Sequence, residues 1–289
     1  MAKNFVLYVG IALICIAIGI VIWYQAGSVK RLFKKETAEK FRAGILAVSP
    51  QTDPVTENDI VHLPQPVQKY LRYAGVVGKN RVRNARFAFD GDFKMSPKQN
   101  WIRVRTEQYN FFDDLTRIFY IRGKMFGIPV VGRDLYAEGK GNMIIRTAGL
   151  IPVADAKGPD MDTSGLVTMF NDMCLLAPAT LIDGRIQWEP IDSLTARGTL
   201  EHNGKRVSAT LYFNERGELA NFVTDNRYYS PTGKTSKRVR WSTPAHDYRD
   251  FAGLKITSVG EGVWHFEEGD FPYARFNLKR VEYNLKAAR

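Results

Sequence analysis

The histidines, cysteines and clustered carboxylates are the residues that could bind a metal or catalyse a reaction, and their spacing favours neither role. The four histidines are scattered without an HExxH or paired-ligand pattern, and the two cysteines, Cys15 and Cys174, lie in apolar runs. A protein zinc site requires several such ligands at a regular spacing. We therefore expect no metal centre and no cofactor.

One acidic run allows two interpretations. Asp155, Asp160 and Asp162 are compatible with a calcium ion, because carboxylate oxygens are the ligands that calcium prefers. The same residues precede a predicted helix, and negative charge is favourable at the start of a helix. We favour the second interpretation, a solvated loop next to a helix N-terminus.

No complete motif predicts a reaction, so no catalytic residue is assigned. The nucleotide-binding loops are incomplete, and without a GxSxG turn Ser242, His246 and Asp247 do not predict a hydrolase triad. An enzyme of unrecognised type would require polar residues that converge in a cleft. The candidates for such a polar cluster are Asp134, Asp192, Arg227 and His265.

A helix predicted at about residues 164–177 is the element around which the rest of the chain is organised. Its apolar positions, spaced i, i+3, i+4 and i+7, are Leu166, Met169, Phe170, Met173, Cys174 and Ala177. Thr168, Asn171 and Asp172 mark its polar side, and Pro178 ends it. Strand-like segments precede and follow the helix, so we expect it to lie across one face of a sheet.

Alternating apolar and polar residues predict antiparallel strands along most of the chain. The clearest hairpin spans residues 195–213 and turns at Asn203-Gly204. A break in the two-residue period near Lys279-Arg280 predicts a β-bulge in the last strand. About ten or more strands without βαβ alternation predict a mainly β, β-rich α+β fold. We expect a large curved antiparallel sheet or open barrel with the helix covering its concave face.

A large sheet curled over one short helix is predicted to leave an apolar cavity. The residues predicted to line it are Met169, Phe170, Met173, Trp188 and Trp264. The alternative is that these residues fill a solid core, which methionine and aromatic side chains usually do.

The N-terminal residues 5–24 form an uncharged run that is long enough to cross about 30 Å of hydrocarbon as a helix. The run ends in Trp23 and Tyr24, which suit a membrane interface, and it lacks the small residues of a signal-peptide cleavage site. The predicted organisation is a transmembrane anchor (1–25), a basic amphipathic stalk and linker (26–58), and an antiparallel β domain with an inserted helix (59–289).

The net charge of +11 predicts attraction to polyanions. Carboxylates near the strand arginines predict cross-strand ion pairs, and a tethered protein is a poor genome binder, so we expect membrane lipids as partners and no nucleic acid. Within the stalk, the apolar residues of an amphipathic helix that could lie on anionic lipid are Leu32, Phe33, Ala38, Phe41 and Leu46. A solvated stalk is the alternative.

These features predict a single-pass protein of a bacterial inner membrane. The positive-inside rule places the domain in the cytoplasm, because six Lys and Arg residues lie between positions 30 and 42, after the span. A short basic lead directly before an apolar helix is, by contrast, typical of exported bacterial domains. We lean towards an extracytoplasmic domain.

Several phrases taken together resemble a family of bacterial membrane-associated proteins known only as a domain of unknown function. They lie at Leu63–Gly75, Gly132–Tyr136, Gly139–Met143, Gly158–Asp162, Ala177–Leu181, Ile186–Asp192, Gly262–His265 and Gly269–Tyr273. The resemblance implies no activity or cofactor. It implies a shape similar to the half-open barrels of lipoprotein carriers, the LolA-like proteins.

Three functions follow from these predictions. The first is non-catalytic binding of a hydrophobic or lipid-like ligand in the concave cavity beside a membrane. The second is a scaffold or sensor that binds a protein partner through an exposed strand edge or loop. The third is an enzyme of unrecognised type, for which no motif exists.

Overall fold

The computed structural model describes residues 8, 10, 11, 13, 14, 16, 17, 19, 20, 27–45, 53–149 and 151–289. The predicted anchor therefore lies largely outside the described residues, as does Cys15, although the nine positions described before residue 27 are helical. Across the described positions, no helix combines the length and hydropathy that a membrane crossing needs. The anchor stays a prediction.

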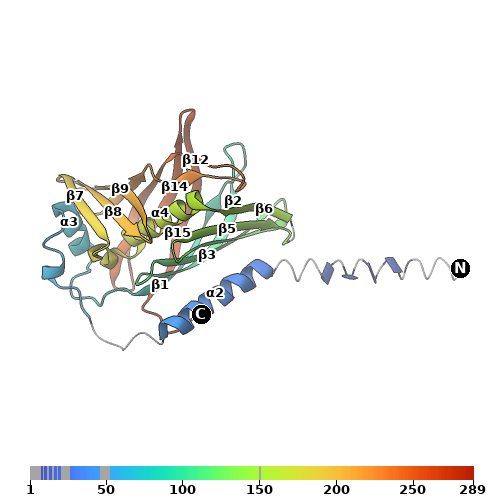
Figure 1. Ribbon diagram of the computed structural model, residues 1–289, viewed down its shortest axis with the longest axis horizontal. Coiled ribbons are helices and arrows are strands. Elements are labelled where there is room, and N and C mark those ends of the chain that lie inside the picture. Colours follow the sequence, from blue (N-terminus) through green and yellow to red (C-terminus); the bar gives the residue numbers. More distant parts are fainter. Residues whose placement is uncertain are drawn as a thin grey trace.

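One antiparallel sheet makes up most of the described chain, and its thirteen strands run in the order β6-β5-β4-β3-β2-β1-β15-β14-β13-β10-β9-β8-β7 (Figure 1). The first half contains β1 (Asn84–Phe93), β2 (Ile102–Phe111), β3 (Thr116–Met125), β4 (Ile128–Ala137), β5 (Lys140–Thr147) and β6 (Ile151–Lys157). The second half contains β7 (Ile186–Asp192), β8 (Thr195–His202), β9 (Lys205–Phe213), β10 (Leu219–Thr224), β13 (Arg240–Phe251), β14 (Leu254–Phe266) and β15 (Gly269–Tyr283). A separate ribbon pairs β11 (Tyr228–Tyr229) with β12 (Lys237–Arg238).

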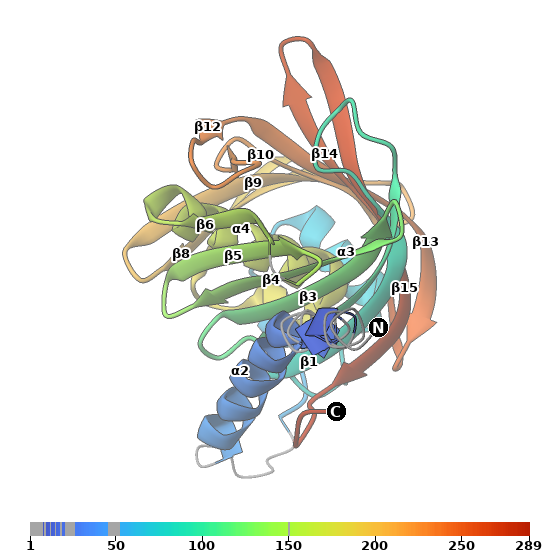
Figure 2. The same cartoon turned by 90° about the vertical axis from the view of Figure 1, so that its right-hand side faces the viewer.

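The sheet curls around helix α4 (Pro159–Leu176) and remains open, because its end strands β6 and β7 do not pair with each other (Figure 2). The predicted fold class is thereby confirmed. The Asn203-Gly204 turn is also confirmed, and both residues have positive φ, 48° and 71°. The predicted bulge is present as well, since the register of β15 against β1 skips Lys279.

Helix α4 begins at Pro159, earlier than predicted, and packs closely on the sheet. Pro159 suits a first helical turn because it has no N–H to leave unpaired, and Gly158 before it has a φ of 106°. Gly165 permits the close approach, because a Cβ built there would lie 2.7 Å from the ring of Tyr136 on β4. A side chain at residue 165 would push the helix away from the sheet.

The apolar side of α4 lies in a solid core. Leu166, Met169, Phe170 and Met173 are each at most 1% exposed and pack with the inner sides of β8, β9 and β10. Helix α3 (Gln65–Tyr73), preceded by η1 (Glu57–Asp59), closes this side, and the hydroxyl of Tyr70 donates to the carbonyl of Cys174 at 2.8 Å. After α4, the short helix η2 (Pro178–Ile182) leads into β7.

The predicted stalk contains helix α2 (Ser28–Ile45), which packs on the outer face of the sheet (Figure 2). Val29, Phe33 and Phe41 are buried against a cluster that includes Tyr109 and Ile118. Of the five residues predicted to face lipid, Phe33 and Phe41 are buried against strands β2 to β4 instead, and Leu46 lies outside the described residues. Sequence periodicity identifies such a side but not its partner.

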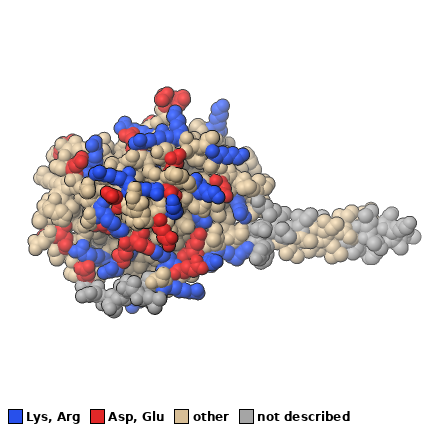
Figure 3. Space-filling model, viewed as in Figure 1, with Lys and Arg blue, Asp and Glu red and all other residues tan. Residues whose placement is uncertain are grey.

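Basic and acidic side chains are interspersed over the face of the domain seen in Figure 3. Several form the cross-strand ion pairs that the sequence predicts. The pairs are Arg86 with Glu107 at 2.8 Å, Arg105 with Asp90 at 3.5 Å, and Arg240 with Asp225 at 3.0 Å. Much of the positive charge on these strands is thus balanced locally.

We predict that Gly165→Ala destabilises the protein by about 1–3 kcal/mol, because the added methyl group overpacks the contact with Tyr136. In an exposed helix the same change would stabilise by about 1 kcal/mol. Urea denaturation followed by circular dichroism measures the effect. Gly184→Ala is the matched control, since a Cβ there meets nothing within 4 Å. A G165A protein as stable as G184A would contradict the close packing.

Candidate functional site

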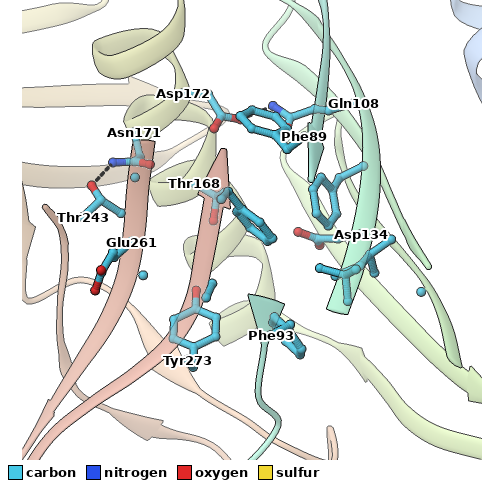
Figure 4. Close-up of a pocket in the computed structure, with 18 of the residues that line it drawn as sticks. Phe89, Phe93, Gln108, Asp134, Thr168, Asn171, Asp172, Thr243, Glu261 and Tyr273 are labelled. Carbon is cyan, nitrogen blue, oxygen red and sulfur yellow. Dashed lines mark hydrogen bonds between the residues drawn. The ribbon is translucent and has the colours of Figure 1, made fainter. Parts of the chain in front are cut away.

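A partly open cavity of about 230 Å³ lies between α4 and the inner faces of β1 to β5 and β13 to β15 (Figure 4). Most of its wall is apolar. The apolar lining side chains include Phe89, Phe93, Ile102, Val104, Phe119, Ile121, Val130, Met143, Ile145, Leu175, Leu176, Phe276 and Leu278. In Figure 4, Phe93 and Tyr273 lie at one end and Asp172 and Gln108 at the other.

The strands supply this wall through their two-residue period, which sends alternate side chains to the same face. On β2, for example, Ile102, Val104 and Gln108 face inward, whereas Arg103 and Arg105 are exposed on the outer face. The inward positions of β1, β3, β4 and β5 follow the same rule. The polar groups of the cavity are therefore exceptions to an apolar pattern.

The polar side of α4 faces the cavity and is buried. Thr168, Asn171 and Asp172 are each at most 9% exposed and all three line the cavity. The side-chain amide of Asn171 donates to the hydroxyl of Thr243 on β13 at 2.6 Å, the dashed line in Figure 4. The hydroxyl of Thr168 donates to the carbonyl of Ser164 within the helix at 2.9 Å. Each polar group on this side thus has a partner in the protein.

Asp172 belongs to a buried ionic network that joins α4 to β2, β3 and β4. The Nε of Arg117 donates to Asp172 at 2.8 Å, and its Nη1 donates to Asp134 at 2.7 Å. The side-chain amides of Gln108 and Asn110 donate to the same Asp172 oxygen at 2.7 and 3.0 Å. One arginine therefore ties two carboxylates from two elements together.

Burial and charge act in opposite directions on the pKa values of this network. Burial raises the pKa of Asp172, and the opposing effect of Arg117 and the two amides does not cancel it. Burial lowers the pKa of Arg117, but the two carboxylates outweigh this effect and raise the pKa overall. Arg117 and the two amides therefore offset part of the cost of burying the Asp172 carboxylate.

A second polar group borders the cavity at the β13 side. The guanidinium carbon of Arg227 lies 3.9 Å from the ring centroid of Trp241, and both residues line the cavity. Neither the Nη1 of Arg227 nor the Nε1 of Trp241 has a hydrogen-bond partner in the described part of the chain, although both atoms are buried. This group differs from the Arg117 network, whose donors are nearly all used.

The five residues predicted to line the cavity do not line it. Met169, Phe170, Met173 and Trp264 lie in the solid core, and Trp188 packs against that core and donates to the carbonyl of Leu181. The correction has a simple cause. Large apolar side chains fill space wherever the sheet reaches them, so the apolar side of α4 leaves no cavity.

The predicted polar cluster is only half assembled. Asp134 and Arg227 line the cavity, but Asp192 and His265 do not. Asp192 is exposed at the end of β7, where it accepts a hydrogen bond from the backbone N–H of Leu194. These four residues therefore do not form one site.

His265 instead joins a Ser-His-Asp chain that sequence reasoning missed. Its Nε2 lies 2.8 Å from the hydroxyl of Ser242, and its Nδ1 lies 2.7 Å from a carboxylate oxygen of Asp270. These residues occupy neighbouring strands of the sheet, and Ser242 is 1% exposed, so a substrate cannot reach its hydroxyl.

The acidic run also has protein partners. Asp162 accepts from the backbone N–H of Gly141 at 2.8 Å and pairs with Lys140 and Lys205. Asp160 contacts the hydroxyl of Ser236. No group of three or more potential metal ligands occurs among the residues with described positions. Asp160 and Asp162 lie in the first turn of α4, where negative charge is favourable. The predicted solvated loop is wrong, because Asp155 lies on β6 and Asp162 is 3% exposed.

The residues of the buried network that the sequence analysis missed share one signal. Gln108, Asn110 and Arg117 are polar residues at inward positions of strands that also present apolar residues inward, such as Val104 and Phe119. Such a residue must find a partner inside the protein, so several of them on adjacent strands predict a buried network.

Comparisons with known proteins identify a family. The sequence matches the family described as a family of unknown function, DUF6544, over residues 53–276. A search among curated proteins found no match. Similar solved structures include a LolA superfamily protein from Nitrosomonas europaea, with 8% identity, a TM-score of 0.27, and coverage of 75% of this chain and 92% of that chain.

A second similar structure is a β-barrel-like protein of the domain of unknown function DUF1849 from Brucella abortus. It has 10% identity and a TM-score of 0.23, with coverage of 71% of this chain and 99% of that chain. The expected resemblance to LolA-like proteins thus reappears among the structures. At these scores neither structure supports a function for this chain.

We predict that Arg117→Met destabilises the protein by about 3–5 kcal/mol at pH 7.5, because it leaves Asp172 buried and charged without its cation. The pKa of Asp172 is raised in the folded protein, so protonation of Asp172 stabilises the fold. This stabilisation is fully present below the pKa of about 3.9 in the unfolded chain, and it is lost as the pH rises through the pKa of the folded protein. Without Arg117 this pKa rises further, and the deficit of R117M shrinks towards pH 4.5.

Urea denaturation of R117M and the wild type at both pH values measures this difference. Arg240→Met is the matched control, because Arg240 and Asp225 are 59% and 62% exposed and such pairs contribute about 0–1 kcal/mol. An R117M deficit that is the same at both pH values would show that the buried charge of Asp172 is not its cause.

Proposed function

Because this chain belongs to the DUF6544 family of unknown function, we propose its function from its own cavity: it binds a hydrophobic or lipid-like molecule there, without catalysis. The observation that carries this proposal is the contrast between the two sides of α4. The apolar side is packed solid, whereas the polar side faces a cavity with a mostly apolar wall. Small-molecule sites commonly combine such a wall with a few placed polar groups.

The cavity size limits the part of the ligand that is enclosed. An engineered apolar cavity of about 150 Å³ holds benzene, so 230 Å³ accommodates on the order of nine or ten non-hydrogen atoms. This is the size of a medium-length alkyl chain or one aromatic group with substituents. Because the cavity is partly open, a longer molecule can extend beyond it.

The non-catalytic part of the proposal rests on the chemistry of the lining. The ionisable groups of the Arg117 network are engaged with one another, and the Ser242–His265–Asp270 chain lies outside the cavity with a buried hydroxyl. A general base needs hydrogen-bond access to a substrate proton. The described lining offers no nucleophile with a free base beside it.

A scaffold that binds a protein partner is the second candidate, and the open edges of the sheet favour it. Strands β6 and β7 each end the sheet, and they expose Ile151 (60%) and Ile191 (50%). An exposed edge strand can pair with a strand of another chain. The cavity has no role in this function, so blocking the cavity separates the two candidates.

We predict that a diazirine-bearing analogue of decanol labels the full chain in phosphatidylcholine nanodiscs at cavity-lining residues. Ile121→Trp reduces this labelling roughly tenfold, because the indole occupies space that the ligand needs. Peptide mapping by mass spectrometry gives the sites. Ile128→Trp is the matched control, since Ile128 is 48% exposed on β4 and does not line the cavity. Equal labelling of both variants would contradict ligand binding in the cavity.

We also propose that residues 5–24 anchor the domain in a bacterial inner membrane with the domain on the extracytoplasmic side. The uncharged run supports the anchor, and α2, which packs on the sheet, would hold the domain close to the bilayer. We predict that a C-terminal alkaline phosphatase fusion is active and a green fluorescent protein fusion is dark. The reverse pattern would place the domain in the cytoplasm.

A further inference from the structure

The charged residues that line the cavity differ in one respect: whether they have an oppositely charged partner. They are Arg117, Arg133, Arg227, Asp134, Asp172 and Glu261. Arg117 pairs with both aspartates, Arg133 pairs with Glu36 on α2 at 3.3 Å, and Glu261 pairs with Arg275 at 3.5 Å. Arg227 has no ion pair with any residue in the described ranges.

Arg227 is held over aromatic rings with part of its guanidinium buried. Its guanidinium carbon lies 3.9 Å from the ring centroid of Trp241 and 5.5 Å from that of Trp264. Its Nη1 atom is buried and donates to no acceptor among the described residues. An arginine side chain stays charged at any physiological pH, so this cation borders the cavity uncompensated.

Trp241 adds a second unused donor to the same place. The residue is 3% exposed, and its Nε1 has no acceptor within the described chain. Guanidinium and indole N–H groups can only donate, so a ligand atom that satisfies them must be an acceptor. Leaving a buried donor unpaired costs free energy, which an acceptor on a bound ligand would recover.

The cavity also has one unused acceptor, which belongs to a carboxylate whose charge is already balanced. Asp134 leaves its Oδ1 buried without a partner, but its Oδ2 accepts from Arg117 at 2.7 Å. A ligand cation would therefore meet a neutralised carboxylate at one side and the free charge of Arg227 at the other. The net preference of the lining is for an anion.

We infer that the ligand is an amphiphile with an anionic head group, a carboxylate or a phosphate, which Arg227 and the Nε1 of Trp241 bind while the apolar tail lies along the inner faces of the strands. The inference rests on the proposed function and narrows it to a ligand class. The Arg227 fork suits both head groups, since each offers two acceptor oxygens.

The test is competition against the diazirine analogue of decanol in nanodiscs at pH 7.5. Decanoate, decyl phosphate, decanol and decyltrimethylammonium are added in turn, and each competes with the analogue for labelling of the full chain. For each protein we measure the preference for an anion, which is the concentration of decanol needed for half-competition divided by that of the anion. We expect this preference to be about ten- to one-hundredfold greater in the wild type than in the Arg227→Met variant, the range for one charge-assisted hydrogen bond. Partition into the lipid is the same for both proteins and cancels. The better of the two anions identifies the head group.

Two further variants complete the test. Trp241→Phe keeps the ring beneath Arg227 but removes the Nε1 donor, so it loses part of the preference. Arg206→Met removes an exposed arginine outside the cavity and keeps the whole preference. If R227M fails to fold by circular dichroism, the ratio of decanoate to decanol competition in W241F, compared with that in the wild type, decides.

The outcomes separate the two levels of the proposal. A ratio of anion to decanol competition that is the same in the wild type and in R227M overturns the anionic head group while ligand binding stands. A preference for decyltrimethylammonium overturns it in the same way. Absence of labelling in the cavity by the decanol analogue overturns the proposed function itself.

Discussion

The polar side of α4 is the constraint on which the rest of this structure depends. A helix enclosed by a curled sheet must satisfy every polar side chain inside the protein, because an unpaired buried polar group is costly. Asp172 meets this demand through Arg117 on β3, and Asn171 meets it through Thr243 on β13. These two attachments bind α4 to opposite wings of the sheet. The strands between these attachments present apolar side chains, and the short polar side chains of α4 leave a cavity in front of them.

Much of the fold follows from sequence periodicity, because the two-residue period of strands and the 3.6-residue period of a helix are local properties. The antiparallel sheet, the α4 helix and the Asn203-Gly204 turn were all predictable in this way. The periodicity also identified Thr168 and Asp172 as the polar side of the helix. It could not show that the sheet curls far enough to enclose that side, since the curvature comes from the twist summed over thirteen strands.

The candidate site was harder to predict, because a cavity is defined by what is missing. Met169 and Phe170 were chosen as cavity lining for their size, and their size is the reason that they leave no space. Arg227 was identified among the polar candidates, but its position over Trp241 depends on the pairing of distant segments. The same holds for Ser242 and His265, which lie 23 residues apart in sequence and meet only through the register of two strands.

Helix α2 supplies the last element of this arrangement, because it stabilises the cavity wall from outside. Strand β3 presents Phe119 and Ile121 to the cavity, and β4 presents Val130. Packing is incomplete there, so the stability of these strands must come from elsewhere. Their outer face is covered by Val29 and Phe33 of α2, and the ion pair of the partly buried Glu36 with Arg133 fixes the helix to β4. Burial raises the pKa of Glu36 against the opposing effect of Arg133. A strand that is packed on one face can leave its other face free for a ligand. The amphipathic segment next to the predicted anchor thus supports the wall of the cavity, and the apolar side that would suit a lipid surface is already occupied by the protein itself.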